Sequence, residues 1–220
     1  MDNIVRYKFY REHKYLSFVL NNLERLIAKT NFQIPEEVTK VAEQFKAAVE
    51  LLKGHAEYED NCLHVLLKQK NSQIYKHIEE DHGILDETLN NLQLSLDRVN
   101  TSLSALEKVE AGYLFYIAYR KFVGENLIHL HEEETVILPE LQRLYSDKEL
   151  KEVEAKTYAI LTSDELVNML QVLFPYMNAA DKKAFLSDIK ECQPEKYAVI
   201  WPQIKFQIPE HELPIVNVID

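Results

Sequence analysis

The sequence predicts an all-α protein in which an up-down four-helix bundle is followed by a helical C-terminal extension. Only four glycines occur in 220 residues, a composition that disfavours a turn-rich β protein. Apolar residues recur three or four positions apart in four long segments, which is the spacing of one face of an α-helix. Short breaks near 30–35, 70–72 and 100–111 separate these segments, and short connections are typical of antiparallel neighbours in a bundle.

The first helix is expected over residues 3–29, and Pro35 suits the first turn of the second helix. The inward-facing positions of the second helix form a regular series: Val38, Val41, Phe45, Ala48, Leu52, His55, Glu59, Cys62 and Leu66. In this series a histidine and a glutamate interrupt an apolar face without changing its spacing. Both polar side chains are therefore predicted to point into the bundle.

The third helix is expected to follow residues 70–72 and to end near Asn100, and the fourth to run from about Ala111 to about Tyr145. The third helix should turn inward Tyr75, Ile78, His82, Leu85, Leu89, Leu92 and Leu96; the fourth should turn inward Phe115, Tyr119, Phe122, Asn126, His129, Glu133 and Val136. His64 and His131 fall off these faces, and we expect both on the surface.

Each predicted helix carries one histidine on its inward face, where a soluble bundle normally holds leucine or isoleucine. These residues are His13, His55, His82 and His129. Neighbouring histidines lie at similar distances along the chain from a shared turn, so a rise of about 1.5 Å per residue places all four in one layer. Glu59 and Glu133 follow His55 and His129 by four residues and join that layer.

A single buried histidine is more often a hydrogen-bonded core residue than a metal ligand, and a lone His-x-x-x-Glu pair is common on helix surfaces. Four histidines and two carboxylates in one layer reverse that balance, because a carboxylate buried without a cation is strongly destabilising. The predicted ligands of a metal centre are His13, His55, Glu59, His82, His129 and Glu133. Imidazole and carboxylate donors without a thiolate suit non-haem iron, with manganese and zinc as alternatives.

The donors occur in a fixed order of motifs: Glu12-His13, His55-x-x-x-Glu59, Asp81-His82-x-x-Leu85, and His129-x-x-x-Glu133-Glu134 before Pro139. In this order and phase the chain resembles the hemerythrin-like (HHE cation-binding) family over about residues 5–145. The resemblance implies a cofactor of two iron ions, with carboxylates bridging the ions and histidines completing their coordination.

The chain departs from the oxygen-carrying members of that family, which have a further histidine on the third helix where this chain has Ile78. Its fourth-helix acid also lies four residues after the histidine, one fewer than in those members. One coordination position is therefore open to water or substrate, or is filled by Glu57, Glu132 or His77. An open position favours reactivity or sensing over simple carriage of O2.

The favoured function is a non-haem di-iron protein that binds or senses a diatomic ligand, O2 or NO. The first alternative is a di-iron redox enzyme that reduces peroxide or NO, or donates iron for cluster repair, together with a redox partner protein. The second is an iron-responsive regulatory or interaction module, and a metal-free bundle with a histidine core is the third. Whether the protein is an enzyme, and its oligomeric state, stay open.

Charge and composition exclude some partners. With 25 basic and 36 acidic residues the net charge is −11, which disfavours nucleic acid because phosphate binding needs a basic face. No apolar run reaches the roughly 18 to 20 residues of a membrane span, and the start lacks a signal-peptide core. With only Cys62 and Cys192, we expect a cytoplasmic protein with free thiols.

Two domains are predicted, a bundle over 1–145 and a helical extension over 146–220. Capping boxes beginning at Ser146 and Thr162 should open two helices of the extension. From Phe206 onward, prolines and β-branched residues predict an extended tail. Packing over the bundle and dimerisation are equally open as roles for the extension.

Overall fold

The computed structural model describes residues 6–217, apart from the side chains of His77, Glu79 and Asp81. Helices make up its regular structure, and no strand occurs among the described residues, so the all-α prediction is confirmed. The chain forms two compact units, each with its own hydrophobic core. The central unit is Leu16–Ile137, and the composite unit combines residues 1–15 with 138–220. The predicted domain limits remain a prediction.

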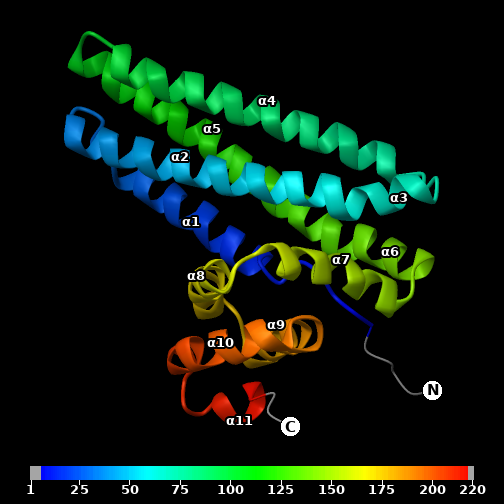
Figure 1. Cartoon of the computed structure of the whole chain (residues 1–220). Coiled ribbons are helices and arrows are strands. Elements are labelled where there is room, and N and C mark those ends of the chain that lie inside the picture. The colour runs from blue at the N-terminus through cyan, green and yellow to red at the C-terminus, as the bar shows by residue number, and fades with distance from the viewer. Residues whose placement is uncertain (1–5, 218–220) are drawn as a thin grey trace. The chain divides into compact units, whose positions relative to one another are not determined.

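The central unit consists of long helical segments, drawn from blue to green in Figure 1. They are α1 (His13–Lys29, from Leu16 onward), α2 (Pro35–Tyr58) with η1 (Glu59–His64) and α3 (Val65–Gln69), α4 (Ile74–Thr101), and α5 (Ala105–Glu132) with η2 (Glu133–Ile137). All of these segments except η1, α3 and η2 contribute side chains to one core that includes Leu20, Phe45, Leu92 and Tyr119. The up-down order of a four-helix bundle stays a prediction.

The first helix is shorter than predicted, because α1 begins at His13 instead of near residue 3. Tyr10 has a φ of 67°, a left-handed conformation that an α-helix cannot contain, and residues 6–10 are irregular. Residues 3–5 of the predicted helix lie outside the described part of the chain. The irregular segment is held by contacts inside the composite unit, which a helical pattern does not reveal.

Two π-helices interrupt the long segments, and each begins at one of the predicted glutamate ligands. They are η1, which starts at Glu59, and η2, which starts at Glu133. A π-turn holds one more residue than an α-turn, so it rotates the following residues by about 100°. The buried positions are consequently Leu63, His64 and Leu67 in place of Cys62 and Leu66, and Ile137 in place of Val136. The surface prediction is correct for His131 and wrong for His64.

The fourth helix starts earlier than predicted. A capping box at Ser104 and Glu107 opens α5 at Ala105, because the two residues satisfy each other's backbone N–H groups. The preceding helix ends at Thr101, as predicted. Among the described residues, no helix combines the length and apolar character needed to cross a membrane.

The composite unit contains the C-terminal helices and the N-terminal segment. Its elements are α6 (Leu138–Leu144), α7 (Asp147–Ile160), α8 (Ser163–Leu173), η3 (Phe174–Tyr176), α9 (Ala179–Cys192), α10 (Pro194–Ile204), η4 (Lys205–Gln207) and α11 (Leu213–Val216). The capping boxes at Ser146 and Thr162 are confirmed. The prediction of an extended tail is wrong for α11, where a helical turn forms and Val216 is buried.

Polar contacts attach the N-terminal segment to the C-terminal helices within this unit. The Nε atom of Arg6 donates to Asp147 Oδ1 at 2.7 Å. The buried carboxylate of Asp188 accepts from the Arg11 guanidinium at 2.9 Å and from the Tyr7 hydroxyl at 3.0 Å. The extension therefore anchors the segment that precedes α1, which the sequence predicted to be helical.

Candidate metal centre

The helices of the central unit place five of the six predicted ligands together. His55 lies on α2, His82 on α4 and His129 on α5, while each glutamate begins a π-helix. Both glutamates are fully buried. The donor atoms of His82, His129 and the two glutamates all lie within 4.8 Å of one another. Because a π-turn changes the direction of the side chains that follow, its position at each glutamate is typical of a functional site.

One side of the cluster has the spacing of ligands on a single ion. His82 Nε2 lies 3.2 Å from His129 Nε2, and His129 Nε2 lies 2.9 Å from Glu133 Oε1. Two ligands at right angles on one metal ion, each about 2.1 Å from it, are about 3.0 Å apart. The described donors therefore fit a transition-metal ion without rearrangement of the helices.

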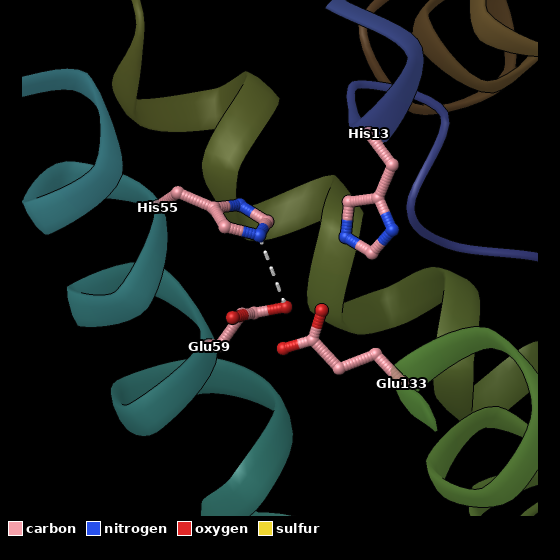
Figure 2. Close-up of side chains that lie close together, drawn as sticks. All are labelled: His13, His55, Glu59 and Glu133. Carbon is pink, nitrogen blue, oxygen red and sulfur yellow. Dashed lines mark ion pairs between the residues drawn. The ribbon is translucent and has the colours of Figure 1, made fainter. Parts of the chain in front are cut away.

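The second carboxylate faces two histidines. Glu59 Oε1 lies 3.4 Å from His55 Nε2, and Glu59 Oε2 lies 3.7 Å from His82 Nε2. Figure 2 shows the carboxylates of Glu59 and Glu133 directed toward each other, with the His55 ring above Glu59. A carboxylate with one oxygen toward each of two imidazoles has the geometry needed to bridge two ions.

The sixth predicted ligand, His13, is buried at the start of α1. Its ring stacks on Tyr10, with 4.6 Å between the ring centres. His13 belongs to the composite unit, so its part in the centre stays a prediction.

Burial and nearby carboxylates act in opposite directions on the histidines. Burial lowers the pKa of His82, but hydrogen bonds and charges from Glu133 and Asp60 outweigh it and raise the pKa above its ordinary value. Burial also lowers the pKa of His64, and there the bond to Asp60 compensates only in part. The carboxylates thus favour a cationic partner at the cluster, whether a proton or a metal ion.

A cavity of about 230 Å³ opens beside these donors within the central unit. Its walls include His55, Glu59, His82 and His129, with Leu52, Leu85, Leu89, Phe122, Asn126 and Leu130 among the other lining residues. On α5, Phe122 and Asn126 lie about two turns and one turn before His129 and line the cavity. Tyr119, one turn earlier still, packs in the core and donates to the Leu20 carbonyl oxygen. The cavity gives a small molecule access to the donors.

The residues suggested for the remaining coordination position have different surroundings. Glu57 is exposed and lines the cavity, and Glu132 is half-buried. The side chain of His77 lies outside the described part of the structure.

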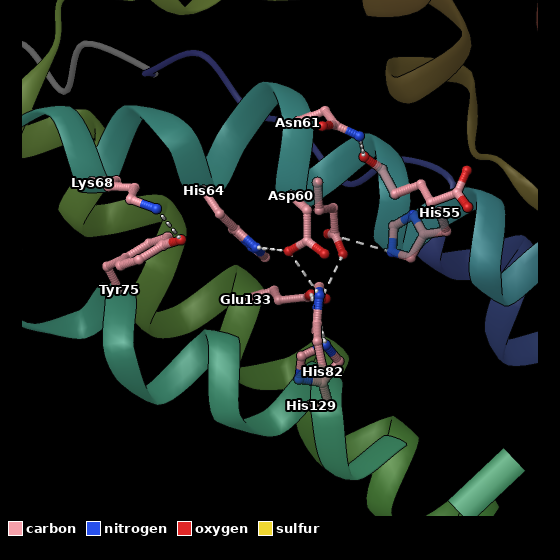
Figure 3. Close-up of polar contacts among 11 residues, drawn as sticks. His55, Asp60, Asn61, His64, Lys68, Tyr75, His82, His129 and Glu133 are labelled. Atoms are coloured by element: carbon pink, nitrogen blue, oxygen red, sulfur yellow. Dashed lines mark hydrogen bonds and ion pairs between the residues drawn. The ribbon is translucent and has the colours of Figure 1, made fainter. Parts of the chain in front are cut away.

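Sequence reasoning missed Asp60 and His64, which adjoin the cluster. Asp60 lies within hydrogen-bond distance of both His64 and His82 (Figure 3). The buried fraction of His64 depends on the π-turn, and no glycine or proline marks that turn in the sequence. The only signal was the histidine itself, four residues after an aspartate.

Comparison with known proteins gives a family and distant relatives. Residues 5–141, more than half of the chain, match the family model of the hemerythrin HHE cation-binding domain. The chain is 23% identical to F-box/LRR-repeat protein 5 of Bos taurus over 183 residues, which cover 80% of the chain and 25% of that protein. It is 24% identical to the protein of the same name from Pongo abelii, over 72% of the chain and 22% of the relative. The chain thus spans about a quarter of the length of these curated relatives, and no solved structure matches it.

Proposed function

Since the chain belongs to the hemerythrin HHE cation-binding domain family, we propose that its central unit is an up-down four-helix bundle that holds two iron ions. Membership of the family implies that a metal cation binds, and the clustered histidines and glutamates supply donors for it. Iron is proposed because the donor set combines several imidazoles with few carboxylates, a mixture that suits iron better than calcium or magnesium. Manganese and zinc are the alternatives.

In this proposal Glu59 and Glu133 lie between the two ions. His82 and His129 hold one ion, supported by the 3.2 Å between their Nε2 atoms. His55 holds the other together with the predicted ligand His13. When bound, the iron pair would supply electrons and an open coordination position; the protein supplies the ligand geometry and a cavity beside the donors.

We further propose that the centre binds or senses a diatomic ligand, O2 or NO. The observation that supports this is the cavity of about 230 Å³, in which donor residues meet the walls of Phe122 and aliphatic side chains. A cavity of this size admits a diatomic molecule next to the donors. Asn126 is an uncharged polar residue of the lining, and its buried amide is the group that we propose to hydrogen-bond such a ligand.

Anaerobic loading with Fe(II), followed by titration with NO or O2, tests this function through the visible absorption of the iron centre. We expect saturable binding that is reversed by removing the gas, and weaker binding in Asn126→Ala. The matched control is Asn90→Ala, which changes an exposed asparagine on α4. An iron-loaded protein whose absorption does not respond to either gas would contradict the proposal.

The second candidate is an iron-responsive regulatory or interaction module. It is favoured by the relatives named F-box/LRR-repeat protein 5, because the segment that matches this chain makes up a quarter or less of each relative's length. Such a module would lose order on chelation without reacting with O2 or NO. Limited proteolysis of the iron-loaded and chelated protein separates this candidate from ligand binding, and turnover with a reductant would identify the redox enzyme.

A further inference from the structure

Asp60 lies between two imidazole rings at the edge of the donor cluster. Its Oδ1 atom is 3.0 Å from His82 Nδ1 and 3.1 Å from His64 Nδ1. Figure 3 shows the Asp60 carboxylate between the two rings, and the His82 ring next to that of His129. One oxygen therefore accepts from both histidines when each ring carries its hydrogen on Nδ1.

The π-helix η1 creates this arrangement, because it turns Asp60 and His64 toward α4. The His64 side chain is only 2% exposed, whereas that of Asp60 is 52% exposed. The Nε2 atom of His64 has no hydrogen-bond partner among the described residues. The bond to Asp60 is thus the polar contact that fixes the His64 ring, and His64 in turn restrains a carboxylate that solvent could otherwise reorient.

His82 presents its two nitrogens to different partners. Its Nε2 faces His129 and the glutamates, and its Nδ1 faces Asp60. A neutral imidazole carries one hydrogen, so an Nδ1–H donated to Asp60 leaves the lone pair of Nε2 for a metal ion. Histidines that ligate metals usually donate their other N–H to a carboxylate or carbonyl group, which sets the tautomer and the ring orientation.

We propose that Asp60 and His64 are positioning residues for His82, forming a His64–Asp60–His82 relay that directs Nε2 of His82 at one of the two metal ions. The inference rests on the proposed dinuclear centre. It assigns the relay to a single ion, because Asp60 contacts His82, whose Nε2 faces His129 on one side of the cluster. Loss of the relay should therefore affect the two ions unequally.

The rival arrangement is a third cation held by Asp60, His64 and His82, whose donor atoms also lie within 4.8 Å of one another. That ion would need the lone pair of His82 Nδ1, and a neutral ring cannot offer both nitrogens as ligands. The relay predicts two ions per chain and a hydrogen on His82 Nδ1, whereas the rival predicts a third ion and no hydrogen there.

Competition between the protein and a chelator for Fe(II), under anaerobic conditions, measures the affinity for each ion. In Asp60→Ala we expect one of two ions to bind about 10- to 100-fold more weakly and the other to keep its affinity. His64→Leu should show the same loss to a smaller degree, and His64→Gln should recover part of it because its amide can donate to Asp60. The matched control is Asp86→Ala, which removes an exposed aspartate from the wall of the same cavity.

Nitrogen NMR of the wild-type protein loaded with diamagnetic Zn(II) provides a second readout that requires no variant to fold. The relay predicts that His82 carries its hydrogen on Nδ1 and that His64 does the same. An Nε2–H form of His82, equal affinities in Asp60→Ala and Asp86→Ala, or three ions per chain would overturn the relay. A wild-type protein that binds no metal would instead overturn the proposed function, and the relay with it.

Discussion

The Nε2 atoms of His82 and His129 lie 3.2 Å apart, although 47 residues separate the two histidines in the sequence. Two imidazole nitrogens at this distance either share a hydrogen or bind one metal ion. The carboxylate of Glu133 is fully buried, and its Oε1 atom is 2.9 Å from His129 Nε2. Its negative charge favours the second arrangement, in which both histidines bind one metal cation. This pair is where the account of the centre can first be tested.

If His82 and His129 hold the same ion, their substitutions should not be additive. We expect His82→Leu and His129→Leu each to remove one of two ions, and the double variant to lose no more than either single variant, because residues that share a partner are coupled. Metal analysis after gel filtration measures the number of ions retained. His131→Leu, which changes an exposed histidine on the same helix, should retain both. Loss of a second ion in the double variant would show that the histidines serve different ions.

Two glycines of α5 should respond in opposite ways to the same substitution. A methyl group at Gly112 would overlap the ring of Phe32, so Gly112→Ala should destabilise the protein by about 1 to 3 kcal/mol. Nothing lies near the corresponding position of Gly124, and Gly124→Ala should stabilise the helix by about 0.5 to 1 kcal/mol. Urea unfolding monitored by circular dichroism measures both. Equal effects would mean that Phe32 does not pack on this helix.

The buried ion pair of Arg11 and Asp188 should be sensitive to loss of one partner. Their side chains are 10% and 7% exposed, and the N–O distance is 2.9 Å. Asp188→Ala leaves the guanidinium buried without its counter-charge, which should lower the free energy of unfolding by about 3 to 5 kcal/mol. Lys46→Ala breaks an exposed pair with Glu50 and should change it by less than about 1 kcal/mol. Similar small effects in both variants would show that the N-terminal segment is not anchored through Asp188.

The capping box of α5 should make a pH-dependent contribution to stability. Hydrogen bonds from the backbone and hydroxyl of Ser104, and from the backbone of Leu103, lower the pKa of Glu107 below its ordinary value of 4.5. A carboxyl group whose pKa is depressed in the folded state contributes stability that is complete above the unfolded value and is lost as the pH falls through the folded pKa. An NMR titration should show the pKa of Glu107 returning toward 4.5 in Ser104→Ala. An unchanged pKa in that variant would contradict the capping box.

Helical periodicity predicted the inward faces well wherever the backbone is regular. The buried residues of α2 up to Leu52 are those of the predicted series. In α5 the predicted Phe115, Tyr119, Phe122 and Asn126 are buried, and Gly112 and Val123 are buried beside them. The positions of His55, Glu59, His82, His129 and Glu133 also come together, although their role as ligands remains a prediction. A constant period of 3.6 residues is a sound assumption for such segments.

The prediction failed where the backbone departs from that period or where distant residues decide the structure. The π-turns at Glu59 and Glu133 shift every later position by one residue, so His64 moved from the predicted surface to the interior. The left-handed Tyr10 and the bonds of Arg11 to Asp188, far along the chain, replaced the first turns of the predicted helix. Local spacing carries no information about contacts of that kind. The capping box at Ser104, by contrast, was readable from the sequence and was missed.

The central claim is that two iron ions lie between Glu59 and Glu133, and iron content per chain tests it most directly. The wild-type protein and the Glu59→Ala/Glu133→Ala variant would be loaded anaerobically with Fe(II), freed of loosely bound metal and analysed for iron. We expect about two ions in the wild-type chain and none in the variant, since both ions depend on the bridging carboxylates. No tightly bound iron in either protein, or equal amounts in both, would contradict the account and leave the buried histidines with a structural role.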